Sequence, residues 1–160
     1  MIWLLEGLSF SVVGFFVSVF FSYLYLKRRE KIDLSALKIF NEFTTLGLIY
    51  LFSWMLNSLF FYLIVVVLAV LFFLGESVHF LMSINEQYRV MFLSFGYNDR
   101  EFSLYQIRKK LFKSFVKPAL KFFGLYIVFS NADLKNPFVI SILLVLGVTI
   151  GLLNGVDKFD

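Results

Sequence analysis

The chain has 160 residues, of which 60% are apolar and 16% are charged, and its formal net charge is +4. Soluble domains contain about 45–50% apolar residues, and a chain of this size has too little interior to bury the excess. The composition therefore excludes an ordinary soluble domain. With no cysteine in the sequence, disulfides, thiolate nucleophiles and cysteine-based metal sites are also excluded.

The apolar residues form continuous runs rather than the alternating pattern of barrel strands, so we expect helical membrane spans. The first run covers about residues 3–26 and ends at a basic cluster, KRREK, at residues 27–31. It has no positive leading segment and meets the basic cluster directly, which predicts a retained span rather than a cleaved signal peptide. By the positive-inside rule, the cluster is cytoplasmic and the N-terminus is outside.

Residues 32–43 alternate between apolar and charged side chains. This spacing predicts a short amphipathic helix lying along the membrane surface, capped by Asp33 or Ser35.

The almost wholly apolar stretch at residues 44–84 predicts either one long tilted helix or a hairpin of two spans. Asn57 and Ser58 form an acceptable turn near its middle. A second basic cluster occupies residues 89–121, and if both clusters are cytoplasmic the chain must cross an even number of times between them. We therefore favour two spans, near residues 41–56 and 59–82, the first of them short.

Residues 85–121 are the longest polar stretch and predict a cytoplasmic amphipathic segment. Residues 101–121 show helical spacing, and Pro118 should kink or end that helix. Its expected apolar face consists of Leu104, Ile107, Leu111, Phe115 and Leu120. Lysines recur there at every fourth residue: Lys109, Lys113, Lys117 and Lys121. We first interpret this ridge as positive-inside topology with contact to anionic membrane lipid. A docking face for a cytoplasmic protein is the second interpretation. Nucleic acid is an unlikely partner, because no reading motif is present.

The final span is expected at residues 137–155, with Pro137 in its first turn. The apolar stretch at residues 122–129 is too short to cross alone. If it only dips into the membrane, the protein has four spans and an outside C-terminus; if it crosses, there are five and the C-terminus is inside. We favour four. The predicted fold is a single all-α, polytopic membrane domain of about four transmembrane helices plus cytoplasmic amphipathic helices.

The first and the last predicted spans each carry a stripe of small residues. The last span carries Gly147, Gly151 and Gly155, and the first carries Gly7, Ser11, Gly14, Ser18 and Ser22. Small residues let helix backbones approach closely in a bilayer, so both stripes predict helix packing, within the chain, between copies in a homo-oligomer, or with another protein. The alternative for the first stripe is a water-filled pore lining.

Three ionisable residues fall within predicted spans: Glu6, Glu76 and His79. Such residues are costly in a membrane and are functional candidates for that reason. Glu76 and His79 have the i, i+3 spacing of paired metal ligands, but the motif occurs once, so we expect no metal and no cofactor. A proton-relay role is better supported, because histidine titrates near physiological pH. We favour contact with headgroups or water.

No catalytic constellation is present, so the sequence does not predict an enzyme. The first functional hypothesis is an assembly or interaction protein of a cytoplasmic (inner) membrane. It would self-associate through the small-residue faces and present its basic helix to a cytoplasmic protein or anionic lipid, as a sensor or effector in phage defence would. The alternative is a small homo-oligomeric ion channel lined by the first span, with Glu6 or Glu76 forming a selecting ring.

Overall fold

A computed structural model describes residues 2–27, 33–83, 86–132 and 136–156, and every regular element among them is helical. The elements, in chain order, are α1 (Ile2–Lys27), the 3₁₀ helix η1 (Ser35–Ile39), α2 (Glu42–Met55), α3 (Ser58–Ser83), α4 (Glu86–Ser94), α5 (Asp99–Gln106), the π-helix η2 (Ile107–Leu111), α6 (Phe112–Asn131) and α7 (Pro137–Val156).

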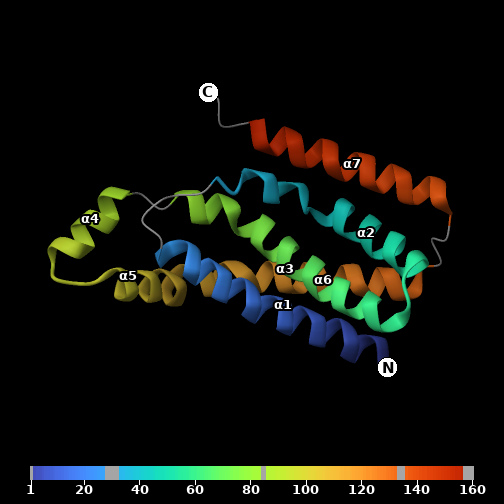
Figure 1. Ribbon diagram of the computed structural model, residues 1–160, viewed down its shortest axis with the longest axis horizontal. Coiled ribbons are helices and arrows are strands. Elements are labelled where there is room, and N and C mark those ends of the chain that lie inside the picture. Colours follow the sequence, from blue (N-terminus) through green and yellow to red (C-terminus); the bar gives the residue numbers. More distant parts are fainter. Residues whose placement is uncertain (1, 28–32, 84–85, 133–135, 157–160) are drawn as a thin grey trace.

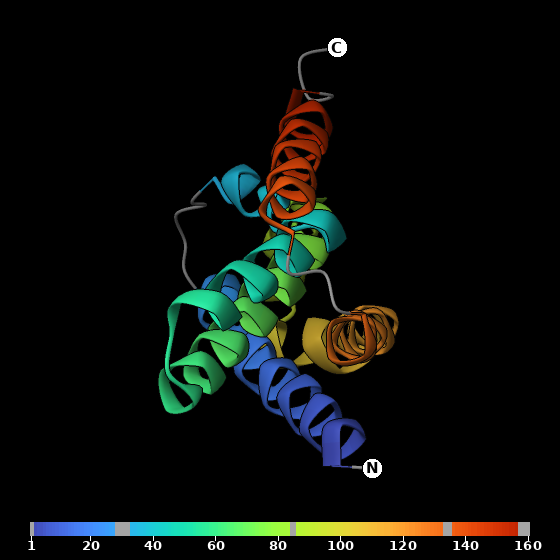
Figure 2. The same ribbon diagram turned by 90° about the vertical axis from the view of Figure 1, so that its right-hand side faces the viewer.

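Five long helices, α1, α2, α3, α6 and α7, lie side by side with alternating directions along the long axis of the molecule (Figure 1). The start of α1, the junction of α2 and α3, the end of α6 and the start of α7 lie at one end, which we call the turn end. The end of α1, the end of α3 and both α4 and α5 lie at the opposite end, which we call the basic end, and α7 runs toward it. Figure 2 shows α7 and α1 at opposite edges, with α2 and α3 between them.

Three of the helices are long and apolar enough to cross a membrane: Trp3–Lys27, Ser58–Val78 and Pro137–Asn154. The apolar stretch at residues 44–84 is divided between α2 and α3, because Leu56 adopts an extended backbone conformation that ends α2. The alternative of one continuous helix is therefore wrong for this stretch. Helix α3 is long enough to cross a membrane, whereas α2, with 14 residues, is shorter than a usual span.

Where the sequence predicts an amphipathic helix at residues 32–43, the described part of that segment, residues 33–43, forms a shorter helix before α2 begins. This segment contains the five-residue helix η1, which packs between α3 and α7. Glycine permits the contact on both sides: a Cβ atom at Gly75 would lie 2.5 Å from the Leu37 carbonyl oxygen, and one at Gly151 would lie 2.6 Å from the Ile39 Cα. The segment therefore contacts α3 and α7, while none of the side chains of η1 is fully buried.

At the start of η1, Asp33 Oδ1 accepts a hydrogen bond from the Ser35 backbone N–H at 2.9 Å, and at the start of α2 the cap is Asn41. Its Oδ1 accepts hydrogen bonds from the backbone N–H groups of Phe43 and Thr44, both at 3.1 Å, which satisfies two free donors at the start of α2. Its Nδ2 donates to the carbonyl of Gly147 at 2.6 Å. One buried side chain therefore both begins α2 and ties it to α7.

Helix α6 continues through Pro118 to Asn131, so this proline does not end the helix. The apolar face expected for the segment is wrong in part, because Leu104 and Leu120 are 50% and 67% exposed. A π-helical turn closes over five residues rather than four, so η2 shifts the helical register by about one position. After it, the buried face consists of Phe115, Pro118, Phe122 and Tyr126.

The core lies between α1, α3 and α6 and is largely aromatic. Phe72, Phe73, Phe115 and Phe122 are fully buried, and their ring centroids lie about as far apart as favourable aromatic pairs do. Phe73 lies 6.0 Å from Phe115 and 6.2 Å from Phe122. Rings from α3 and α6 therefore interleave beneath α1.

We predict that Gly147→Ala lowers the stability of the bundle, because the added Cβ would lie 2.8 Å from the Thr44 Cα and closer still to its hydroxyl. Overpacking of this kind costs about 1–3 kcal/mol. The matched control is Gly124→Ala, since a Cβ there meets nothing within 4 Å; alanine should stabilise that helix by about 0.5–1 kcal/mol. Unfolding in mixed detergent micelles measures both, and equal effects would contradict the packing.

Candidate functional site

Three charged side chains from three helices meet near the middle of the structure. The Lys121 ammonium, on α6, lies 2.6 Å from a carboxylate oxygen of Glu42 and 3.0 Å from one of Glu76. Glu42 begins α2, and Glu76 lies on α3. The three side chains are 24–39% exposed, so they are partly withdrawn from the surface. We call this group the charge cluster.

The charge cluster joins α2, α3 and α6 through one ammonium group. Lysine offers three donors, and Lys121 uses them on Glu42 and on both carboxylate oxygens of Glu76, the second at 3.1 Å. Ionisable groups inside membrane proteins are tolerated where they pair with one another. The arrangement therefore acts as a clamp between helices, with one cation set against two carboxylates.

The predicted Glu76–His79 pair is not tested as a metal or proton site, because the side chain of His79 lies outside what the structure describes. Among the described residues, no group of three or more histidine, aspartate or glutamate side chains could hold a metal ion. Glu76 instead has a cationic partner that sequence spacing did not indicate, since Lys121 is 45 residues away.

Glu6 occupies a second polar site, near the turn end. Its carboxylate accepts a hydrogen bond from the Tyr126 hydroxyl at 3.0 Å and a longer one from the Tyr62 hydroxyl at 3.4 Å. The ring of Phe10 packs on both tyrosines, with centroids 5.3 Å and 5.8 Å away. Helices α1, α3 and α6 thus share one carboxylate, and Glu6 is bound to neighbouring helices.

The small-residue stripe of α1 faces α3 and α6 of the same chain. The Ser11 hydroxyl donates to the Ala119 carbonyl at 3.0 Å, and the Ser18 hydroxyl lies 2.7 Å from the Gly14 carbonyl and 3.3 Å from that of Val70. A Cβ atom at Gly14 would lie 2.8 Å from the Ala69 Cβ.

The other members of the α1 stripe are also covered. A Cβ atom at Gly7 would lie 2.8 Å from the Tyr126 ring. Ser22 is fully buried, but its hydroxyl has no hydrogen-bond partner in the described structure.

The stripe of α7 also packs within the chain. Gly147 lies against Thr44 at the start of α2, and Gly151 lies against Ile39 of η1. The surroundings of Gly155 are outside what the structure describes. Because Gly151 supports the fold of a single copy, a bulky residue there would disturb that copy before it tested any contact between copies.

The four ridge lysines have different environments. Lys109 donates to the Tyr105 hydroxyl at 2.7 Å and lies 5.1 Å from the centre of that ring. This hydrogen bond raises the pKa of Lys109. Lys117 is exposed, Lys121 belongs to the charge cluster, and the side chain of Lys113 is not described. The regular spacing therefore does not predict a common role.

Helices α4 and α5 form a hairpin, residues 86–106, which we call the arm. The Arg89 guanidinium lies 2.7 Å from Asp99 Oδ1 and joins the two helices. Inside the hairpin, Phe92 packs on Tyr97, Phe102 and Tyr105, with ring centroids 4.5–5.6 Å away. The arm therefore has a small aromatic core of its own.

The arm also exposes a set of apolar and aromatic side chains that sequence reasoning missed. These are Tyr88, Val90, Met91, Leu93, Phe95, Tyr97 and Leu104. The sequence signal for this exposed set was the series of apolar residues at 88–97. It lies outside every predicted span, so lipid was not expected to cover it.

Comparison of the chain with protein-family models, with curated proteins and with solved structures gives no match. Any assignment of function therefore depends on the contacts within the chain and on the surfaces it leaves exposed.

We predict that Lys121→Met destabilises the bundle, because Glu42 and Glu76 lose the hydrogen bonds that Lys121 gives them. A hydrogen bond to a charged group contributes about 1.5–3 kcal/mol, and partial exposure of the cluster places the expected loss at the lower end. Lys117→Met is the matched control, because exposed Lys117 acts on Glu42 only weakly and through space, and it should change stability by less than about 0.5 kcal/mol.

Adding Glu76→Gln to Lys121→Met should recover part of the loss, because it removes one unpaired carboxylate. Unfolding in detergent micelles measures all three variants. If Lys117→Met and Lys121→Met have equal effects, the clamp does not exist.

Proposed function

We propose that this chain is a non-enzymatic assembly or interaction protein of a cytoplasmic membrane, anchored by five crossing helices, which docks a cytoplasmic protein through its arm. The observation that carries the proposal is the arm itself, which projects beyond the bundle (Figure 1) and exposes several apolar and aromatic side chains.

The five-helix topology is supported by how basic residues fall along the sequence. Along the sequence, the basic residues at 27–31 follow the end of α1 and those at 89–110 precede α6, whereas the residues between α6 and α7 include one lysine, Lys135. Positive charge marks the cytoplasmic side of a membrane protein. The basic end would therefore be cytoplasmic, and the end of α7 would lie there too.

The two helices beyond the three long apolar ones have lengths and positions that fit this arrangement. Helix α6 has 20 residues, about 30 Å in all, and the 14 residues beyond Lys117, at 118–131, extend about 21 Å, so a crossing by α6 requires a locally thinned bilayer. Helix α2 has 14 residues and is shorter, at about 21 Å. It contacts α3, α6 and α7, and local thinning of the bilayer can accommodate a span of this length. Counting α6 as a crossing favours five spans over four.

A protein partner suits the arm better than a lipid surface does. The arm continues the long axis of the bundle, so its tip at residues 95–97 points away from the helices that would cross the membrane (Figure 1). Phe95 is 71% exposed and Val90 is 66% exposed. Exposed apolar patches on a water-facing segment typically mark protein interaction sites.

The channel alternative has less support. It needs the serine face of α1 to line a pore, but Ser11 and Ser18 donate to carbonyls of α6, α1 and α3, and Glu6 is bonded to two tyrosines. Opening a pore along this face would break those contacts.

The topology is tested by labelling single cysteines, which is direct because the natural chain has none. In right-side-out vesicles, a membrane-impermeant thiol reagent should label Asn57→Cys and not Tyr97→Cys or Asn154→Cys. Inverted vesicles should give the opposite pattern. A four-span protein would instead place the labels at Asn57 and Asn154 on the same side.

Docking by the arm is tested with a photo-crosslinking amino acid placed at Val90 in intact membranes. We expect a discrete crosslinked protein product, lost in Phe95→Asp, because a carboxylate replaces an apolar contact at the tip. Ser94→Asp is the matched control, since it adds the same charge at an exposed polar position and should keep the product.

Leu153, 67% exposed on α7, provides a second control site for the crosslinker, because we expect it to contact lipid alone. A product of twice the chain mass from Val90 would identify a second copy as the partner. Lipid adducts alone at both sites would contradict docking.

A further inference from the structure

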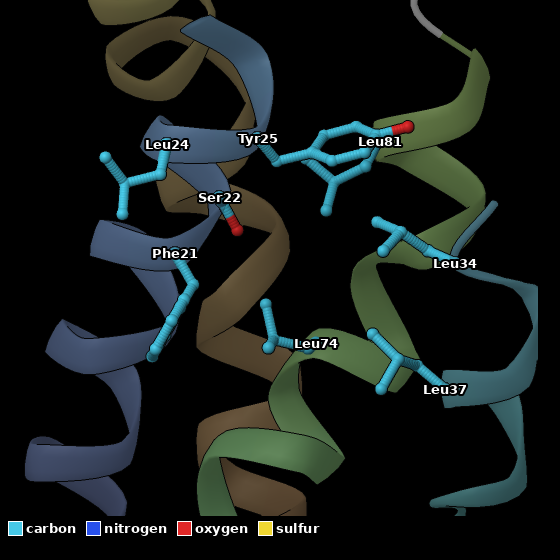
Figure 3. A pocket seen from close by; sticks show the side chains of 8 residues that line it. All are labelled: Phe21, Ser22, Leu24, Tyr25, Leu34, Leu37, Leu74 and Leu81. Atoms are coloured by element: carbon cyan, nitrogen blue, oxygen red, sulfur yellow. The ribbon is translucent and has the colours of Figure 1, made fainter. Parts of the chain in front are cut away.

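A cavity of about 270 Å³ lies near the basic end, between α1, α3 and the segment that contains η1. Figure 3 shows side chains from all three elements around it. Its walls are almost wholly apolar, and the lining residues are Phe21, Ser22, Leu24, Tyr25, Leu34, Leu37, Leu74 and Leu81.

Ser22 and Tyr25 carry the two hydroxyl groups of this lining, and Ser22 is the one that makes the cavity more than a packing defect. The side chain is fully buried, and its hydroxyl has no hydrogen-bond partner. Ser11 and Ser18, on the same stripe of α1, both donate to backbone carbonyls. Leaving a buried hydroxyl unsatisfied is costly, so a group that accepts its hydrogen bond would be bound preferentially in the cavity.

The cavity lies close to the lipid-facing surface of α1. Phe21 is 49% exposed and Leu24 is 40% exposed, although both line the cavity. A ligand can therefore enter sideways from the bilayer. The volume is slightly below the usual lower limit of about 300 Å³ for a small-molecule site, which suits part of an apolar chain better than a whole compact ligand.

The depth of Ser22 in the membrane indicates which kind of apolar ligand would fill the cavity. Lys27 ends α1 five residues later, a rise of about 7.5 Å. The headgroup region of one leaflet is about 5–7.5 Å thick. If Lys27 lies at the level of the lipid phosphates, Ser22 lies at the level of the ester carbonyls, which accept hydrogen bonds and donate none.

We propose that the cavity binds one phospholipid of the leaflet at the basic end. An acyl chain fills the space against Leu37 and Leu74, the ester carbonyl accepts from the Ser22 hydroxyl, and Lys27 attracts an anionic phosphate headgroup. This proposal requires helices that cross a membrane, but it does not require the arm to dock a partner.

The test uses the full chain in phosphatidylethanolamine vesicles containing a phosphatidylglycerol with a diazirine on its acyl chain near the ester. After illumination, adducts should concentrate in peptides containing residues 21–25 and 74–81. Ser22→Ala should lower their yield roughly 2- to 10-fold, the effect of one lost hydrogen bond. Ser9→Ala is the matched control, because Ser9 is exposed near the turn end and its hydroxyl donates to the Glu6 carbonyl.

Thermal unfolding provides a second measurement that separates lipid binding from damage to the fold. In detergent without lipid, Ser22→Ala should be at least as stable as the natural chain, because it removes an unsatisfied hydroxyl. Added phosphatidylglycerol should raise the melting temperature of the natural chain more than that of Ser22→Ala.

Two results would overturn the proposal. Adducts spread evenly over lipid-facing residues such as Phe16 and Leu152, with no change in Ser22→Ala, would show that no lipid is held in the cavity. Equal gains in melting temperature for both proteins would show that Ser22 does not contact the lipid. If the cysteine labelling gives the pattern expected for five spans, either of these results would contradict lipid binding in the cavity but not the proposed membrane topology.

Discussion

The close approach of helix backbones at small residues is the constraint on which the rest of this structure depends. Helices in a bilayer gain little from burying apolar surface against each other, so contact between backbones and side chains must hold them together. At Gly147 and Gly151 that contact brings α7 against α2 and η1, with no room for a Cβ atom. The Asn41 side chain reaches the Gly147 carbonyl only because the two helices are this close.

Polar side chains then determine which helices become neighbours. An unpaired polar group inside an apolar bundle is expensive, so Lys121, Glu6 and Ser11 each favour an arrangement that brings a partner from another helix. Lys121 selects α2 and α3 as neighbours of α6, and Glu6 selects α3 and α6 as neighbours of α1. Small residues permit the contacts, and these polar pairs make them specific.

The sequence predicts the helical class, the break near Asn57 and the existence of packing stripes, because each depends on local properties: apolar length, turn chemistry and residue size. It does not predict the charge cluster, since Glu76 and Lys121 come together through the tertiary fold. It also misassigns the buried face of residues 101–121, because the π-helical turn at residues 107–111 changes the register without a sequence signal that periodicity recognises.

Two exceptions to the usual pattern of polar pairing and apolar burial are the most informative about what this chain does. Within the bundle, most described polar side chains have partners, yet the Ser22 hydroxyl faces an apolar cavity without one. Thr45 and Gln106 also bury an unpartnered atom, but neither lines that cavity. Outside the bundle, the arm has a satisfied ion pair and an aromatic core, yet it exposes Val90 and Phe95. A sequence that satisfies its groups elsewhere leaves such exceptions where another molecule completes the surface. The two exceptions call for different molecules, because Ser22 lines an apolar cavity and Phe95 is exposed on the arm.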